Sequence, residues 1–312
     1  MNRVTFFPIL FSMICSVFAA DIIPFFPYEY VSLDKLHYHN IGTAIVFLQG
    51  DMNPPLDEER NSLVVYGSYN AFVFTDNVND DYSDLYHKVI IAVTKKTKGH
   101  YILGVLNSAS DEPLYIGGLR TAKTGLGYGY EIVRNKNVAL TLGAIAYIGD
   151  FGIEIGNGNS LPIAPLPIVV FNFTSTWLSA YFEFFAEPSL NITVAPESKV
   201  RLTNVFRMEQ FRDIQDLYFD LTLWYRFFSK KHKLGDFAGA GLGIKNKGVN
   251  FIFGEKDKAY GTNYYAAYGI VDLSFLNINS GYVFKSREIF NDKIKNNTGK
   301  GFYISTQLAW KF

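Results

Sequence analysis

From residue 41 onward the chain alternates apolar and polar positions in stretches of roughly ten residues that are separated by turn residues. A period of two is the pattern of β-strands with one apolar and one polar face. The clearest stretch is 217–227, where one face carries Leu217, Phe219, Leu221, Leu223, Tyr225 and Phe227, and the other carries Tyr218, Asp220, Thr222, Trp224 and Arg226. Tyr and Trp on the aqueous face of a soluble sandwich are unusual, so the pattern favours a barrel with the apolar face toward lipid.

The C-terminal stretch from Gly301 to Phe312 has the same alternation. Its apolar face carries Phe302, Ile304, Leu308, Trp310 and Phe312, with Thr306 as its only polar break. The stretch resembles the C-terminal signature of bacterial outer-membrane barrels, which end in Phe. That resemblance implies a bacterial outer-membrane location, and recognition by the barrel assembly machinery through the strand ending at Phe312.

These patterns predict an all-β fold, an antiparallel transmembrane β-barrel of about twelve strands, with ten to fourteen tolerated. No linker interrupts the rhythm, so residues 41–312 are expected to form one barrel domain. An even number of strands is expected, because bacterial barrels return both termini to the periplasm. A soluble periplasmic β-sandwich that binds a ligand stays open as the alternative fold.

The N-terminal residues 1–19 read as a signal peptide. Arg3 is followed by an apolar run from Val4 to Phe18, which is too short to span a bilayer, and small residues precede a cleavage point near Ala20. The only cysteine, Cys15, lies in this run, which leaves a lipoprotein with a lipidated Cys15 as a second interpretation. Residues 20–40 are rich in Pro and aromatics and are expected to precede the barrel as a periplasmic segment or an interfacial amphipathic helix.

The amino-acid composition narrows the class of protein to which the chain can belong. The chain is 48% hydrophobic and 17% aromatic, yet after the signal no window approaches the roughly 20 apolar residues of a transmembrane helix. The excess of aromatics suits the interfacial girdles of a membrane barrel. A formal net charge of +0 gives no reason to expect nucleic acid as a partner, whereas outer-membrane lipids are expected partners.

Neither metal nor cofactor chemistry is indicated. His37 and His39 share a strand face, but His87, His100 and His232 are scattered, and no partner lies at a known ligand spacing. The glycines of Gly125-Leu126-Gly127-Tyr128-Gly129 lie inside a strand pattern rather than between a strand and a helix, so they do not form a phosphate loop. We expect these glycines to mark a close backbone approach or crowding of the lumen by neighbouring aromatics, and we expect no cofactor.

The segment from Asn107 to Pro188 resembles the lipid A palmitoyltransferase (PagP) family of small outer-membrane barrel enzymes. The resemblance lies in Gly127-Tyr128-Gly129-Tyr130-Glu131, in Leu142-Gly143-Ala144 and in the Pro-rich stretch 162–167. It covers less than half of the mature chain. It implies an acyltransferase that acts on membrane lipids.

The catalytic residues that the resemblance implies match only in part. The family's Asp-Ser pair corresponds to Asn107-Ser108, and its first-strand His falls near Asn70. Ser108 is therefore the candidate nucleophile, but Asn107 cannot take a proton at neutral pH. His100 would lie about 26 Å from Ser108 along one strand, which leaves His87 on the neighbouring strand as the candidate base.

The prolines give a separate expectation. Proline removes a ladder donor, so Pro165 and Pro167 at the start of one strand and Pro188 after the next would interrupt the wall. In the resembled family such gaps admit lipid, and lateral lipid access is expected here, with an ordinary periplasmic turn as the alternative.

Two classes of function follow. The first is a narrow pore, a ligand-binding barrel or a structural surface protein. The second is the acyltransferase with Ser108 as nucleophile. The sequence leaves open whether the protein is an enzyme.

Overall fold

The computed structural model describes residues 20–50, 61–75, 83–113, 121–149, 154–155, 159–160, 163–184, 188–210, 215–227, 238–253, 258–273, 275–290 and 293–310. The signal peptide predicted at residues 1–19 lies outside these ranges, as do the lipidation candidate Cys15 and the terminal Phe312. No helix among the described residues is long and apolar enough to cross a membrane.

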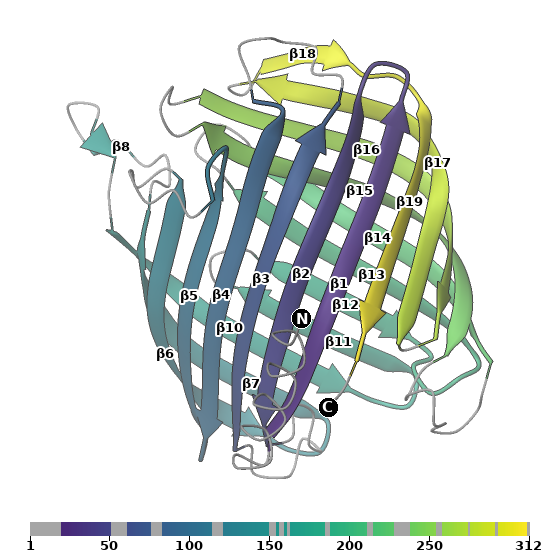
Figure 1. Ribbon diagram of the computed structural model, residues 1–312. Coiled ribbons are helices and arrows are strands. Elements are labelled where there is room, and N and C mark those ends of the chain that lie inside the picture. Colours follow the sequence, from purple (N-terminus) through teal and green to yellow (C-terminus); the bar gives the residue numbers. More distant parts are fainter. Residues whose placement is uncertain are drawn as a thin grey trace, which may run out of the picture.

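The described chain is built from β-strands (Figure 1). The strands are β1 Ala20–Leu33, β2 His37–Gln49, β3 Ser62–Phe74, β4 Leu85–Thr97, β5 His100–Ser110, β6 Ala122–Arg134, β7 Val138–Ile148, β8 Glu154–Ile155, β9 Asn159–Ser160, β10 Ile163–Thr174, β11 Leu178–Phe184, β12 Ser189–Val194, β13 Val200–Gln210, β14 Gln215–Arg226, β15 Gly239–Phe253, β16 Lys258–Asp272, β17 Leu276–Phe290, β18 Lys293–Asn297 and β19 Gly301–Ala309.

The strands close into an antiparallel barrel. Each wall strand pairs with the next, β7 pairs with β10, and β17 pairs with β19. The ring closes where β19 pairs with β1, from Phe25↔Ala309 to Leu33↔Gly301. The hairpin β8–β9 forms a separate sheet, and β18 pairs only with the end of β17. The antiparallel barrel predicted from the sequence is confirmed.

The predicted count of about twelve strands, with ten to fourteen tolerated, is wrong, because sixteen strands form the closed ring in the described chain. The estimate of about twelve assumed that some of the strand-like stretches would be halves of one long strand or periplasmic turns, and it left β1 out of the barrel. The structure keeps even the short stretches as wall strands: β11 has 7 residues and β12 has 6, and both pair with neighbours on each side. Strand length alone therefore does not separate wall strands from turns.

Residues 20–40 do not form a separate segment before the barrel, as the sequence had suggested. Residues 20–33 are β1 and the barrel wall begins at Ala20. The two prolines of β1 are accommodated differently: Pro24 pairs with Ile45 of β2, whereas the register between β1 and β2 omits Phe26 and Pro27 and resumes at Tyr28↔Ile41. Pro27 still pairs with Gln307 of β19, so a proline without a donor is tolerated on one side of the strand.

The predicted division into an apolar outer face and a mixed inner face is confirmed on β14. Leu217 is 59% exposed and Leu223 is 54% exposed on the outside of the barrel. Thr222 on the other face is 3% exposed. The closing strand agrees, since Phe302 is 53% exposed and Tyr303 is fully buried.

Both ends of the described wall lie on one side. β1 starts and β19 ends at the lower end in Figure 1, and β18 lies at the opposite end. We call these the terminal end and the distal end. Tight turns such as Lys98-Gly99 and 135–137 connect strands at the terminal end.

An aromatic core fills part of the lumen near the distal end. Phe251 of β15 stacks on Tyr86 of β4 at 4.7 Å between ring centroids and meets Phe72 of β3 edge-on at 5.0 Å. Tyr260 of β16 stacks on Tyr86 at 5.3 Å. Beside this core, β5 and β15 pair in parallel at Ile252↔Ser110. Opposite walls of the barrel therefore touch at this end, and we call this packing the distal core.

A second cluster covers the inner face of β6. It includes Leu103, Ile145, Tyr147 and Ile168. A Cβ on Gly125 would lie 2.4 Å from Tyr147 Cδ2, and one on Gly127 would lie 2.8 Å from Ile168 Cδ1. The expected crowding by an aromatic side chain is confirmed at Gly125, whereas at Gly127 the crowding side chain is the aliphatic Ile168.

Candidate functional site: a charged chamber in the lumen

Two adjoining cavities of about 210 Å³ each lie in the lumen. Arg207, Tyr218 and Lys247 line both cavities, which we treat together as the chamber. Its walls come from opposite sides of the ring: β3 and β4 contribute Ser68, Asn70 and Lys88, and β13 to β15 contribute most of the remainder. Phe72 and Val249 belong both to the chamber lining and to the distal core. The distal core therefore bounds the chamber on one side.

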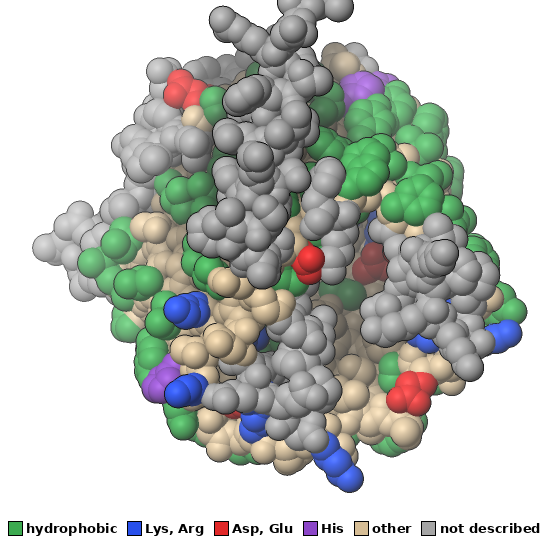
Figure 2. Space-filling view, turned by 60° about the horizontal axis from the view of Figure 1, so that its bottom comes forward, with side chains coloured by type: hydrophobic (Ala, Val, Ile, Leu, Met, Phe, Trp, Pro, Cys, Tyr) green, Lys and Arg blue, Asp and Glu red, His purple; other side chains and the backbone are tan. Residues whose placement is uncertain are grey.

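The view onto the terminal end shows a hollow in this face, with charged side chains inside and around it (Figure 2). Hydrophobic side chains gather on the outer flanks of the same view. The polar interior and apolar exterior thus meet at the rim of this end.

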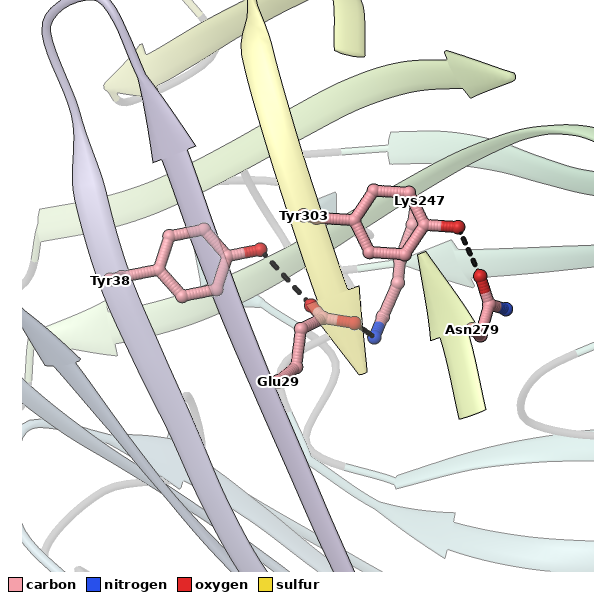
Figure 3. A network of polar contacts seen from close by, with 5 residues as sticks. All are labelled: Glu29, Tyr38, Lys247, Asn279 and Tyr303. Atoms are coloured by element: carbon pink, nitrogen blue, oxygen red, sulfur yellow. Dashed lines mark hydrogen bonds and ion pairs between the residues drawn. The ribbon is translucent and has the colours of Figure 1, made fainter. Parts of the chain in front are cut away.

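Glu29 anchors the chamber at the closing seam. Its side chain is 3% exposed, and its Oε2 forms an ion pair with Lys247 Nζ, which reaches across from β15 (Figure 3). Tyr38 donates its hydroxyl to Glu29 Oε1 at 3.4 Å. A buried carboxylate is stable only when it is paired and hydrogen-bonded, so this contact ties β1 and β2 to β15 across the lumen.

Lys245 lies two residues before Lys247 on the same inner face. Its Nζ is 4.2 Å from the ring centroid of Tyr303 and 4.9 Å from that of Tyr268. Both rings are fixed by their hydroxyls, since Tyr303 donates to Asn279 Oδ1 (Figure 3) and Tyr268 donates to Asp220 Oδ1. The ring faces attract the ammonium group without neutralising its charge.

Asp220 is held by neighbouring hydroxyl groups. Thr222 Oγ1 donates to Asp220 Oδ1 at 3.0 Å, and the Tyr268 hydroxyl donates to the same oxygen. Both bonds go to the same oxygen, and Asp220 lines the chamber with a negative charge.

Arg207 is exposed to the chamber from β13 and forms no ion pair with any residue that the structure describes. The cations of the lining are Lys88, Arg207, Lys245 and Lys247, whereas its carboxylates are Glu29 and Asp220. Because Glu29 forms an ion pair with Lys247, the other charged groups that line the second cavity are Arg207, Lys245 and Asp220, of which two are positive. The chamber is therefore suited to a small anionic group.

No family model and no curated protein sequence matches this chain. Several solved structures are similar to it. They include OccAB3 of Acinetobacter baumannii, with 9% identity, coverage of 94% of this chain and 99% of that chain, and a TM-score of 0.39. They also include the outer membrane protein opdK of Pseudomonas aeruginosa, with 8% identity, the same two coverages and a TM-score of 0.37. These values assign no family, so the architecture and the site rest on the strand pairing and the contacts above.

The structure places the four candidate catalytic residues on two sides of the wall. Asn70 and Asn107 belong to the inner faces of β3 and β5, because they alternate with outward residues such as Tyr69 and Ile102. Ser108 and His87 belong to the outer faces of β5 and β4. The wall therefore separates the two asparagines from the serine and the histidine.

Ser108 and His87 lie diagonally on neighbouring strands, since Ser108 pairs with Val89 and His87 pairs with Ser110. Ser108 Oγ is buried and forms no hydrogen bond with the described residues. His87 Nδ1 is instead 2.7 Å from the Tyr69 hydroxyl. No described base is within hydrogen-bond reach of the candidate nucleophile, and its catalytic role stays a prediction.

The candidate lipid-access prolines lie beside β11. Pro165 and Pro167 are exposed on β10, which pairs with β7 from Ile163 to Phe173 but with β11 only from Val169 onward. Pro188 precedes β12 and accepts a hydrogen bond on its carbonyl from Met208 N at 2.9 Å. In the described chain, the start of β10 thus has a paired neighbour on one side only, and lipid access there stays a prediction.

Sequence reasoning placed Asp220 and Tyr218 in the lumen but missed Glu29, Arg207, Lys245 and Lys247. Glu29 was assigned to the segment before the barrel. The inward orientation of Lys245 and Lys247 could have been predicted from the sequence. Both residues continue the alternate positions occupied by Gly239, Gly241 and Gly243, which were assigned to the lumen. Nothing in the sequence indicated that Glu29 pairs with Lys247, since the two residues are 218 positions apart.

Proposed function

We propose that the protein is an outer-membrane β-barrel that forms a narrow channel for small anionic solutes. The observation that carries this proposal is the chamber beneath the distal core, in which Arg207 lines both cavities and Lys245 lines one of them. Rings or clusters of Lys and Arg favour anions in a pore, as carboxylates favour cations.

The membrane placement is supported by the outer surface. Large apolar side chains are exposed around the ring, among them Leu126 at 70%, Leu242 at 72% and Ile41 at 54%. A water-soluble protein rarely exposes so large an apolar surface, whereas a transmembrane barrel requires an apolar band. The sequence resemblance of the strand ending at Phe312 adds the outer membrane of a bacterium as the location.

The narrowness of the channel follows from the distal core. A sixteen-stranded ring is wide enough for an aqueous channel when its lumen is empty. Here β5 and β15 touch, and the rings of Phe72, Tyr86 and Phe251 fill the space beside them. The passage for a solute is therefore restricted to the part of the lumen that these rings leave open.

The first prediction concerns placement. After expression of the full-length chain, the protein is expected in the outer-membrane fraction, and its gel migration is expected to change on boiling, because a closed barrel resists detergent until it is heated. Recovery in the soluble periplasm, with migration that boiling does not alter, would contradict the membrane placement and favour the soluble alternative.

The second prediction concerns charge. Wild-type protein in planar bilayers under a KCl gradient is expected to show a small conductance that prefers chloride. Arg207→Gln is expected to lower the permeability of chloride about fivefold and to raise that of potassium by a similar factor, since a unit charge about 4 Å from an ion contributes about 1 kcal/mol in water. Lys285→Gln is the matched control. It removes the same charge from a side chain that is exposed on the outer face of β17, away from the lumen.

A silent protein or a cation-selective one would overturn the channel proposal. Equal permeability ratios for Arg207→Gln and Lys285→Gln would show that Arg207 does not face the conducting path. Acyl transfer at Ser108 stays a prediction of the sequence resemblance.

A further inference from the structure

The outer wall of the barrel carries an apolar groove of about 450 Å³ over β4 to β7. Its floor is at Gly104, where a Cβ would meet no heavy atom within 4 Å. Ile91 and Val93 of β4 flank it on one side, and Leu126 and Ile148 flank it on the other. The missing side chain at Gly104 therefore opens a depression among exposed apolar residues.

Two outward pairs of Tyr and His bracket this groove along β4 and β5. At the distal rim Tyr69 Oη is 2.7 Å from His87 Nδ1, and at the terminal rim Tyr128 Oη is 2.7 Å from His100 Nδ1. His87 pairs with Ser110, which lies ten positions beyond His100 on β5.

Ten positions at about 3.4 Å each correspond to about 34 Å along the strand. At a tilt of about 45° this is a height of about 24 Å, which matches the apolar band of outer-membrane barrels, about 25 Å. Tyr side chains with a polar tip favour the membrane interfaces. The two pairs therefore mark the two interfaces, and Gly104 lies near the middle of the apolar band.

The two rims differ in charge. Near the terminal rim, Lys95 and Lys98 are exposed beside the His100–Tyr128 pair. Lys95 pairs with Ile102, the outward residue that precedes Gly104. Near the distal rim, Asp111 lies close enough to His87 to interact with it electrostatically, and Asp84 is exposed just before β4. A phosphate group would be attracted to the terminal rim and repelled from the distal rim.

We propose that this groove binds one acyl chain of a glycerophospholipid, with its phosphate group beside Lys95, His100 and Tyr128. The inference rests on the membrane placement proposed above. The terminal end is the periplasmic end of a bacterial barrel, so the lipid belongs to the periplasmic leaflet. The groove gives the chain a fixed position on the wall, and the basic rim selects a phosphate-bearing headgroup.

Photolabelling of the full chain in liposomes tests the proposal. The probe is a phosphatidylglycerol with a diazirine midway along one acyl chain, added in trace amount to phosphatidylcholine liposomes. Wild-type label is expected to concentrate on β5 and β6. Gly104→Phe is expected to reduce labelling of these strands about fivefold or more, because the ring fills the groove and removes the contact of several methylene groups.

Gly269→Phe is the matched control. Gly269 lies on the outer face of β16, on another part of the ring, and its Cβ would be 3.7 Å from Leu242 Cδ2, an ordinary contact. In this variant the probe is expected to label β5 and β6 as strongly as in the wild type. Uniform labelling of the ring, or equal labelling in the two glycine variants, would overturn the groove as a binding site.

A second probe tests the headgroup. A diacylglycerol with the same diazirine chain lacks the phosphate, and it is expected to label β5 and β6 less than phosphatidylglycerol does. The double variant Lys95→Ala, His100→Ala is expected to remove this difference. Equal labelling by the two probes in the wild type would overturn the assignment of the phosphate.

The bilayer recordings separate this inference from the proposed function. Protein that inserts and conducts but labels uniformly overturns the lipid site alone. Protein that fails to insert overturns the membrane placement, and the lipid site with it.

Discussion

Gly301→Val is expected to prevent closure of the barrel. Gly301 begins β19 and pairs with Val283 on one side and with Leu33 on the other. A Cβ at this position would lie 1.8 Å from the carbonyl oxygen of Ser32. The seam between β1 and β19 would have to part, and each ladder hydrogen bond that is lost costs about 1 kcal/mol net, or more if its groups stay buried.

The measurement is the change in gel migration on boiling, together with protease resistance of the folded band. We expect Gly301→Val to give little or no folded band. Gly269→Val is the control, because it adds the same side chain to a wall strand where the nearest atom is 3.7 Å away. Folded bands of equal intensity in the two variants would show that the closing seam tolerates a side chain at Gly301.

Phe251→Ala is expected to open the distal core and raise the single-channel conductance severalfold. The Phe251 ring is fully buried between Phe72 and Tyr86, which come from the opposite wall. Its removal leaves a cavity in the packing that restricts the lumen. The same change is expected to lower the free energy of unfolding by about 3–5 kcal/mol, the usual cost of Phe→Ala in a core.

Leu242→Ala on the same strand is the control, because Leu242 is 72% exposed on the outer face and is expected to leave conductance unchanged. If Phe251→Ala does not fold, Phe251→Leu keeps the test available with a smaller cavity and a smaller expected increase. A folded Phe251 variant with wild-type conductance would show that the ring does not border the conducting path.

The sequence was most informative about features that depend on a single strand, such as the face on which each side chain lies. The alternation in 217–227 assigned Leu217 and Leu223 to the outer face and Thr222 to the inner face, as the exposed fractions confirm. The glycines of β6 were assigned to close packing, and Tyr147 and Ile168 occupy the space above them. A period of two specifies which way a side chain points without reference to any other strand.

The candidate site shows the opposite case. Ser108 and Asn70, the catalytic candidates implied by the family resemblance, lie on opposite sides of the wall. The charged chamber is instead formed by residues that belong to no recognisable sequence motif. Glu29 and Lys247 meet because β1 and β15 line one lumen, not because of their local sequence. The alternation could show that these residues face inward, but not which of them would be opposite one another.

The sequence by itself thus determined an antiparallel barrel with an apolar outer surface and a mixed interior, because alternation within each strand encodes the two faces of a wall. Only the tertiary structure decided that sixteen strands close the ring, that β5 and β15 touch across it, and that Arg207, Lys245 and the Glu29–Lys247 pair share one chamber. The physical reason is that ring size and contacts across the lumen depend on how every strand is placed relative to its neighbours. That placement is non-local, and the pattern of a single strand carries no information about it.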